Sequence, residues 1–211
     1  MNRQLSMQVA PGAFLIENYL TTDEQKFFIL RCKELGSEPA GFYTPAVRTG
    51  AYMSIRMMCL GLHWNAQTYK YEKVRSDFDG LPVQPIPEDF KETARRIAAH
   101  AGMAIEPDIC LVNFYTGTGK LGLHQDKDER PETLKKGIPV VSISLGDSGS
   151  FLFGGTTRKD PVRTILLKSG DAFLFGGPSR MRFHGVSSII EGSAPTELEV
   201  SGRYNLTFRQ Y

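Results

Sequence analysis

Cysteine is scarce in this chain, and the three that occur are Cys32, Cys59 and Cys110. Their odd number, their wide separation and the lack of any Cys-x-x-Cys spacing argue against a disulfide framework and against a zinc knuckle. A reducing cytoplasm is therefore the expected compartment. The first ten residues also lack the apolar core of a signal peptide, so no secretion signal is expected.

Long apolar runs and a large charge imbalance are missing as well. No stretch is apolar for long enough to span a membrane. The net charge of +2 allows a nucleic-acid partner without requiring one. The length of 211 residues, with 41% hydrophobic and 23% charged residues, predicts one globular domain over 1–211. We expect this domain to be a monomer.

Helical signals are confined to the N-terminal half. Residues 14–19 predict a short strand, and Thr22 then predicts a helix start with Gln25 as its capping-box partner and Gly36 as its end. A second helix is predicted over 87–101, with Pro87 at its first position and Gly102 just beyond its end. Between these helices, residues 41–84 are rich in aromatic and basic side chains.

From residue 107 onward, short β-rich runs alternate with glycine, aspartate and proline. The predicted strands are 109–115, 140–145, 150–153, 164–167, 172–175 and 203–208. Several short strands at this spacing favour a barrel or a sandwich.

The strongest chemical signal is His124-Gln-Asp126. In an extended segment, residues two apart point to the same side, so one imidazole and one carboxylate share a direction. With His184 they would make the two-histidine, one-carboxylate triad of non-haem Fe(II) oxygenases. The alternatives are an accidental match in a polar surface turn over 125–130 and a histidine satisfied in the core.

The segment 203–209 alternates strictly. One face carries Arg203, Asn205, Thr207 and Arg209, and the other carries Tyr204, Leu206 and Phe208. The cationic face suits a dicarboxylate, because guanidinium groups bind carboxylates through paired hydrogen bonds. Asn113 and Tyr115, which share a side of the predicted strand 109–115, could complete such a site. The alternatives are a solvated edge strand with protective charges and a tyrosine bonded to a neighbouring carbonyl.

Taken together and in order, these pieces resemble the bacterial AlkB family of Fe(II)- and 2-oxoglutarate-dependent dioxygenases. The matching pieces are Asn113-x-Tyr115, Leu-x-Leu-His124-Gln-Asp126-Lys-Asp128, His184 and Arg203-Tyr-Asn-Leu-Thr-Phe-Arg209. The resemblance runs from about residue 40 to the end and is loose over 52–57. His63 and the region around Gly137 have no counterpart in the family pattern.

The resemblance implies an α+β, mainly β fold. Its core would be a double-stranded β-helix (jelly roll) over about 107–211, with flanking N-terminal helices and a nucleotide-recognition lid over about 40–85. It also implies Fe(II) on His124, Asp126 and His184. The cosubstrate 2-oxoglutarate would bind Arg203, surrounded by Asn113, Tyr115, Asn205 and Arg209, with O₂ as the oxidant.

The implied reaction is oxidative demethylation of bases such as 1-methyladenine or 3-methylcytosine in single-stranded DNA or RNA, as in repair of alkylation damage. It releases an aldehyde, succinate and CO₂. The resemblance assigns substrate contacts to Met57, Trp64, Asp128 and Arg158. A carboxylate at Asp128 and an aromatic wall at Trp64 would favour a methylated, cationic base.

Basic and aromatic side chains in the lid, among them Lys70, Tyr71 and Arg75, would suit a single strand; an ordinary solvated loop is the alternative. Three other functions stay open. The first is an AlkB-like oxygenase acting on tRNA, protein or a small molecule. The second is a non-catalytic jelly-roll binding module. The third is a zinc hydrolase, for which the sequence offers no evident general base.

Overall fold

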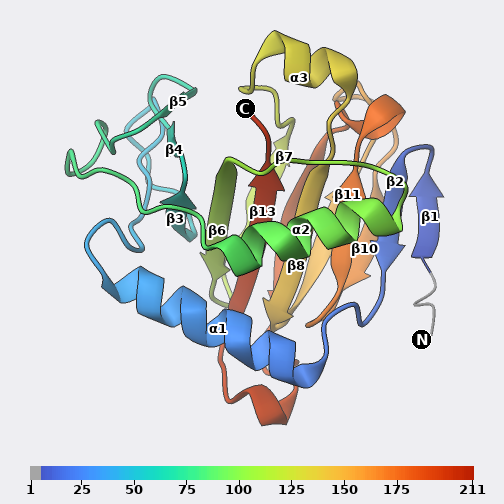
Figure 1. Cartoon of the computed structure of the whole chain (residues 1–211), viewed down its shortest axis with the longest axis horizontal. Helices are drawn as coiled ribbons and strands as arrows, with labels where there is room; N and C mark the ends of the chain where they lie inside the picture. The colour runs from blue at the N-terminus through green and yellow to red at the C-terminus, as the bar shows by residue number, and fades with distance from the viewer. Residues whose placement is uncertain (1–5) are drawn as a thin grey trace.

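The computed structural model describes residues 6–211, which form two antiparallel sheets and a small hairpin (Figure 1). The larger sheet has the order β1-β2-β11-β8-β13-β6-β3, and the smaller has the order β10-β9-β12-β7. The larger sheet consists of β1 (Ser6–Ala10), β2 (Ala13–Ile16), β3 (Arg56–Leu60), β6 (Ile109–Tyr115), β8 (Val140–Gly146), β11 (Ala172–Phe175) and β13 (Arg203–Arg209). The smaller consists of β7 (Leu121–His124), β9 (Ser148–Phe153), β10 (Arg163–Leu167) and β12 (His184–Ile190).

The remaining elements lie outside these sheets. The hairpin is formed by β4 (His63–Asn65) and β5 (Lys70–Glu72). The helices are α1 (Thr22–Ser37), α2 (Glu88–His100) and α3 (Pro131–Lys136), with short 3-10 turns at Gly177–Ser179 and Thr196–Leu198. Within residues 6–211, no helix combines the length and apolarity needed to cross a membrane.

Two hydrophobic layers hold these elements together, and β11 contributes to both. Ala172 and Leu174 pack in the cluster that α1 and α2 share with the larger sheet. Phe173 and Phe175 point the other way, into the cluster between the two sheets. Such alternation is the expected result of the two-residue period of a strand that is buried on both faces. Figure 1 shows α1 and α2 lying across one face of the larger sheet.

Both predicted helices form, with their N-caps displaced by one residue, and α1 continues past its predicted end at Gly36 to Ser37. The side chain that caps α1 is Thr21, paired with Glu24, so the expected box of Thr22 and Gln25 is wrong. Pro87 is the N-cap of α2 rather than its first helical residue. Gly102 has a φ of 70° directly after the helix C-cap, as its predicted position requires.

The strand predictions are accurate where burial is strongest. The segments 109–115 and 172–175 match β6 and β11 at both ends, while β8, β9, β10 and β13 extend one or two residues beyond the predicted limits. The predictions miss the strands β1, β4, β5, β7 and β12 and the helix α3. Gly137, whose surroundings have no counterpart in the family pattern, adopts a φ of 66° as the left-handed C-cap of α3.

For the segment 203–209, which forms β13, the structure excludes the alternative of a solvated edge strand. The strand β13 is not at an edge, because β6 and β8 flank it on either side. All seven residues of β13 are buried. Its cationic face therefore points into the interior, where charged groups need partners or a ligand.

Candidate metal centre and adjoining cavities

Two neighbouring strands of the smaller sheet bring the predicted triad together. His124 ends β7 and His184 begins β12, and the two are directly paired in the antiparallel register. Asp126 follows two residues after β7. Potential ligand atoms of the three side chains lie within 4.8 Å of one another. Among residues 6–211 no other group of three or more metal-ligating side chains is this close.

Hydrogen bonds orient both imidazoles. The Nδ1 atom of His124 lies 2.8 Å from the Gly122 carbonyl, and that of His184 lies 3.0 Å from the Arg182 carbonyl. A carbonyl can only accept, so Nδ1 carries the proton in each ring and Nε2 has a free lone pair. The two Nε2 atoms lie 3.7 and 3.4 Å from the Asp126 carboxylate.

The protonation states of the cluster suit a metal ion. Burial, reinforced by the neighbouring His184, lowers the pKa of His124 below its ordinary value. Burial alone would raise the pKa of Asp126, but the positive charge of Arg209 and the interactions with His184 and His124 together outweigh it, and the pKa of Asp126 lies well below the ordinary value. Neutral imidazole and ionised carboxylate are the forms that ligate a metal.

The buried surroundings of Asp126 were not predicted. Arg209 Nη2 lies 2.7 Å from Asp126 Oδ1, and Arg209 Nη1 donates to the Tyr71 hydroxyl at 2.5 Å. Arg180 Nη1 donates to the Asp126 backbone carbonyl at 2.5 Å, and Arg180 Nη2 lies 3.0 Å from Glu129 Oε2. These contacts hold the backbone and the side chain of Asp126 from separate directions.

Sequence patterns give little sign of this cluster. Glu129 belongs to the polar run that could equally be a surface turn, yet its side chain is fully buried. Tyr71 and Arg75 are also buried, so their expected exposure to a nucleic-acid strand is wrong. Arg75 instead binds Asp79 and the Gly41 carbonyl. Lys70 and Lys73 are exposed, so their contact with a nucleic-acid strand stays a prediction.

Two cavities meet at the metal cluster. The larger, of about 590 Å³, has the predicted substrate residues on its walls. These are Met57, Trp64, Asp128 and Arg158, together with Asn113, His124, Asp126 and Arg209. The smaller, of about 40 Å³, is lined by most of the residues predicted for the cosubstrate, namely Asn113, Tyr115, Asn205 and Arg209, and by all three members of the triad.

Arg203 is the predicted cosubstrate residue that does not line the smaller cavity. It is 1% exposed, and its Nη2 donates to Ser144 Oγ at 2.8 Å. Its Nε has no hydrogen-bond partner, and no carboxylate of the described residues lies within ion-pair distance. Burial lowers the pKa of Arg203 to about 10. A buried guanidinium in this state favours a nearby anionic ligand.

The wall of the larger cavity is built from distant parts of the chain. Trp64 is half-buried: it packs against the hydrophobic cluster that contains Met57 and Tyr71, and it also lines the cavity. Its Nε1 donates to Asp128 Oδ2 at 2.8 Å. Met57 is buried at the base of this region, on β3. Arg158 is exposed, with its guanidinium 5.1 Å from the Phe183 ring centroid.

Comparison with known proteins gives the family. Residues 12–209 match the model of the 2OG-Fe(II) oxygenase superfamily. The chain is 44% identical to the DNA N(6)-methyladenine demethylase ALKBH1C of Arabidopsis thaliana, covering 96% of this chain and 49% of that protein. It is 37% identical to the alpha-ketoglutarate-dependent dioxygenase AlkB of Salmonella typhimurium, covering 96% and 91% respectively.

A solved structure, that of OsALKBH1, superposes with a TM-score of 0.92 at 42% identity, covering 98% of this chain and 100% of that one. The chain spans about half the length of the Arabidopsis relatives that it matches. Because the relatives include plant as well as bacterial proteins, the expected restriction to a bacterial family is not supported. The chain belongs to the AlkB family within the 2OG-Fe(II) oxygenase superfamily.

Proposed function

We propose that this protein removes N-linked methyl groups from bases of single-stranded DNA or RNA, using Fe(II), 2-oxoglutarate and O₂. One observation carries the proposal. The cluster of His124, Asp126 and His184 opens onto a cavity of about 590 Å³ whose wall includes Trp64 and Asp128. A metal centre beside an aromatic wall and a carboxylate is what oxidation of a cationic base requires.

The donor set fits Fe(II). Two imidazoles and one carboxylate leave coordination positions free for other ligands, unlike a closed structural zinc site. Asp126 Oδ2 is buried without a hydrogen-bond partner, as expected of an oxygen that awaits a metal ion. Held by His124, Asp126 and His184, Fe(II) would supply, with 2-oxoglutarate and O₂, the oxidising chemistry that turns the N-methyl group into an aldehyde and frees the base.

The chain's own residues have separate tasks in this proposal. Arg203 binds the far carboxylate of 2-oxoglutarate, because it is a buried cation without an anionic partner. Asn113, Tyr115 and Asn205 add hydrogen-bonding groups beside it, and Arg209 holds Asp126. Trp64 stacks on the base, Asp128 faces its exocyclic amine, and Met57 and Arg158 complete the wall.

A second substrate is N6-methyladenine. Four plant relatives carry this base in their names, and one of them is 44% identical to this chain. N6-methyladenine is neutral, whereas 1-methyladenine is cationic. The carboxylate of Asp128 therefore stabilises bound N6-methyladenine less than bound 1-methyladenine. We therefore rank the cationic lesions first. A substrate in tRNA, protein or a small molecule is the remaining alternative.

We also infer how the chain is organised. Side chains from both sheets form one hydrophobic cluster, which supports a jelly-roll core over about 107–211. The lid of about 40–85 includes β3, which pairs with β6 in the larger sheet, so the part able to cover the cavity is 43–55 and 63–79. A cytoplasmic location is supported by Cys32, Cys59 and Cys110, which are all unpaired and buried.

The test is a stoichiometric assay with Fe(II), 2-oxoglutarate and O₂. Matched single-stranded oligonucleotides would carry 1-methyladenine, 3-methylcytosine, N6-methyladenine or no methyl group. We expect aldehyde and succinate in equal amounts with the first two, together with loss of the methyl group. Turnover of N6-methyladenine alone would favour the second substrate. Succinate without any demethylation would reject a nucleobase substrate.

A further inference from the structure

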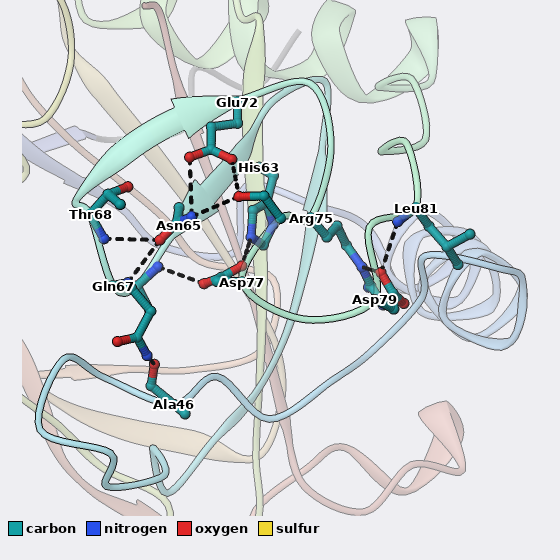
Figure 2. A network of polar contacts seen from close by, with 12 residues as sticks. Ala46, His63, Asn65, Gln67, Thr68, Glu72, Arg75, Asp77, Asp79 and Leu81 are labelled. Atoms are coloured by element: carbon teal, nitrogen blue, oxygen red, sulfur yellow. Dashed lines mark hydrogen bonds and ion pairs between the residues drawn. The ribbon is translucent and has the colours of Figure 1, made fainter.

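His63 is the residue without a counterpart in the family pattern, and it lies directly before Trp64 on β4. Its side chain is fully buried, and its Nε2 lies 2.6 Å from Asp77 Oδ1, whose side chain is only 4% exposed. Figure 2 shows the His63 ring facing the Asp77 carboxylate, with Asn65 and Gln67 beside them. Neither residue lines either cavity at the metal cluster. A direct chemical role is therefore not indicated.

Asp77 holds the chain on both sides of Trp64. One carboxylate oxygen binds the His63 ring, and the other accepts a hydrogen bond of 2.9 Å from the backbone N–H of Ala66. The segment carrying Trp64 is thereby attached at the residue before it and at the second residue after it. A charged acceptor makes both hydrogen bonds strong.

Asn65 fixes the turn that follows. Its Oδ1 accepts from the backbone N–H groups of Gln67 and Thr68, both at 2.9 Å. Its Nδ2 donates to Glu72 Oε1 at 3.1 Å and to Ser76 Oγ at 3.0 Å. The same turn presents Tyr69, whose ring lies 5.8 Å from that of Trp64 and also lines the larger cavity (Figure 2 shows the polar contacts).

Backbone pairing alone would hold this turn weakly. The strands β4 and β5 have three residues each, and the structure describes no further strand beside them in residues 6–211. A two-stranded hairpin of this kind is marginally stable in water. Its geometry must therefore come from the side chains packed beneath it, and the buried pair of His63 and Asp77 is central among them.

We infer that His63 and Asp77 form a positioning pair, which holds the indole of Trp64 at the wall of the larger cavity without touching the substrate. The consequence for catalysis rests on the proposed function. The orientation of the indole can be measured without any substrate, because Trp64 is the only tryptophan of the chain. Its fluorescence therefore reports directly on the orientation and solvent access of the proposed stacking residue, whatever the substrate is.

The experiment compares Asp77→Asn and His63→Leu with the matched control Asp79→Asn, in the full chain. Asp79 lies in the same loop and accepts hydrogen bonds from Arg75 and from the Leu81 backbone, and it makes no hydrogen bond or ion pair with residues 63–69. Emission maximum and acrylamide quenching are measured without any substrate. We expect a red shift and stronger quenching in Asp77→Asn and His63→Leu, and wild-type values in Asp79→Asn.

Two more variants test whether His63 acts through its hydrogen bond to Asp77 or only by filling space in the core. His63→Gln offers an amide N–H near the place of Nε2, whereas His63→Asn offers one near Nδ1. We expect the Gln variant to keep the wild-type spectrum and the Asn variant to behave like His63→Leu. Thermal unfolding is followed for each variant. If His63→Leu does not fold, the role of the pair is decided by Asp77→Asn and by the comparison of His63→Gln with His63→Asn.

The effect of these variants on catalysis is measured with the methylated oligonucleotides of the assay above. Loss of a stacking wall should raise KM by about tenfold in Asp77→Asn, with succinate formation in the absence of oligonucleotide unchanged. Unchanged fluorescence in both Asp77→Asn and His63→Leu would overturn the inference. If the wild-type protein fails to demethylate any oligonucleotide, the proposed function is rejected, and the fluorescence comparison still decides the role of the pair.

Discussion

The indole Nε1 of Trp64 donates a hydrogen bond of 2.8 Å to Asp128 Oδ2, joining residues that are 64 positions apart. This bond links the lid hairpin to the segment that follows the metal motif. Both side chains line the cavity of about 590 Å³. The aromatic face and the carboxylate are therefore fixed relative to each other before any base enters, which lowers the cost of ordering them on binding.

Replacing Trp64 should separate base binding from oxidant formation. Trp64→Ala removes the stacking face and should raise KM for a methylated oligonucleotide by about tenfold or more. Trp64→Phe keeps an aromatic face and loses only the N–H, so we expect a smaller rise. Succinate formation without oligonucleotide should stay near wild type in both variants. An equal loss of both activities in Trp64→Ala would point to a tryptophan that only supports the fold.

Removing His184 should abolish metal binding without unfolding the protein. His184→Ala deletes one of three ligands, and because loss of a supporting partner alone costs about 10–100-fold in metal affinity, we expect a larger loss here. Anaerobic titration with Fe(II) measures the affinity, and circular dichroism checks the fold. Ser187→Ala is the control, because Ser187 is an exposed residue on the same strand. Retained affinity in His184→Ala would reject the triad.

The sequence predicts which side chains share one face of a strand better than it predicts what surrounds that face. Alternation along 203–209 correctly separates Arg203 and Arg209 from Leu206 and Phe208, because a strand has a period of two. The same alternation cannot show that β13 lies between β6 and β8, since that depends on pairings with distant segments. The sequence therefore leaves a solvated edge strand open as the alternative to a dicarboxylate site.

The same limit applies to the site. His124 and Asp126 stand two residues apart in a recognisable pattern, and the pairing of β12 with β7 brings His184 to them. Glu129 and Arg180 carry no local pattern, because their meeting is set by how the segment after β7 packs against the 3-10 turn at Gly177–Ser179. His63 and Asp77 are similar, because only folding of the lid shows that they meet.

Changing Arg203 should weaken the binding of 2-oxoglutarate selectively. Arg203→Lys keeps the positive charge but loses the paired geometry of the guanidinium, and Arg203→Ala loses both. Hydrogen bonds to charged groups contribute about 1.5–3 kcal/mol, so the KM for 2-oxoglutarate should rise by roughly 10-fold to 100-fold in Arg203→Lys.

A second measurement, the increase of Tm on ligand binding, does not depend on turnover. Ligand at about 100 times its Kd stabilises a protein by about 2.7 kcal/mol, and for a protein of this size that corresponds to a Tm increase of about 5–10 °C. The wild-type protein should show this increase with Fe(II) and 2-oxoglutarate under nitrogen, and Arg203→Lys should show much less at the same concentrations. Equal increases in both proteins would move the carboxylate-binding role to another residue.

Breaking the buried pair of Glu129 and Arg180 should destabilise the protein and loosen the metal motif together. Their side chains are 0% and 2% exposed, so Glu129→Gln leaves the guanidinium buried without its charged partner. The expected cost is about 3–5 kcal/mol. Arg180 also donates to the Asp126 carbonyl at 2.5 Å, so the metal affinity should fall along with the Tm.

The double variant Glu129→Leu with Arg180→Met decides what the pair contributes. Replacing both charges by apolar side chains removes the uncompensated charge, so the double variant should be more stable than Glu129→Gln. It still lacks the hydrogen bond to the Asp126 carbonyl, so metal affinity should remain low although stability is restored. If stability and metal affinity recover together, the pair serves only packing; if stability alone recovers, Arg180 holds Asp126 in the geometry that the metal requires.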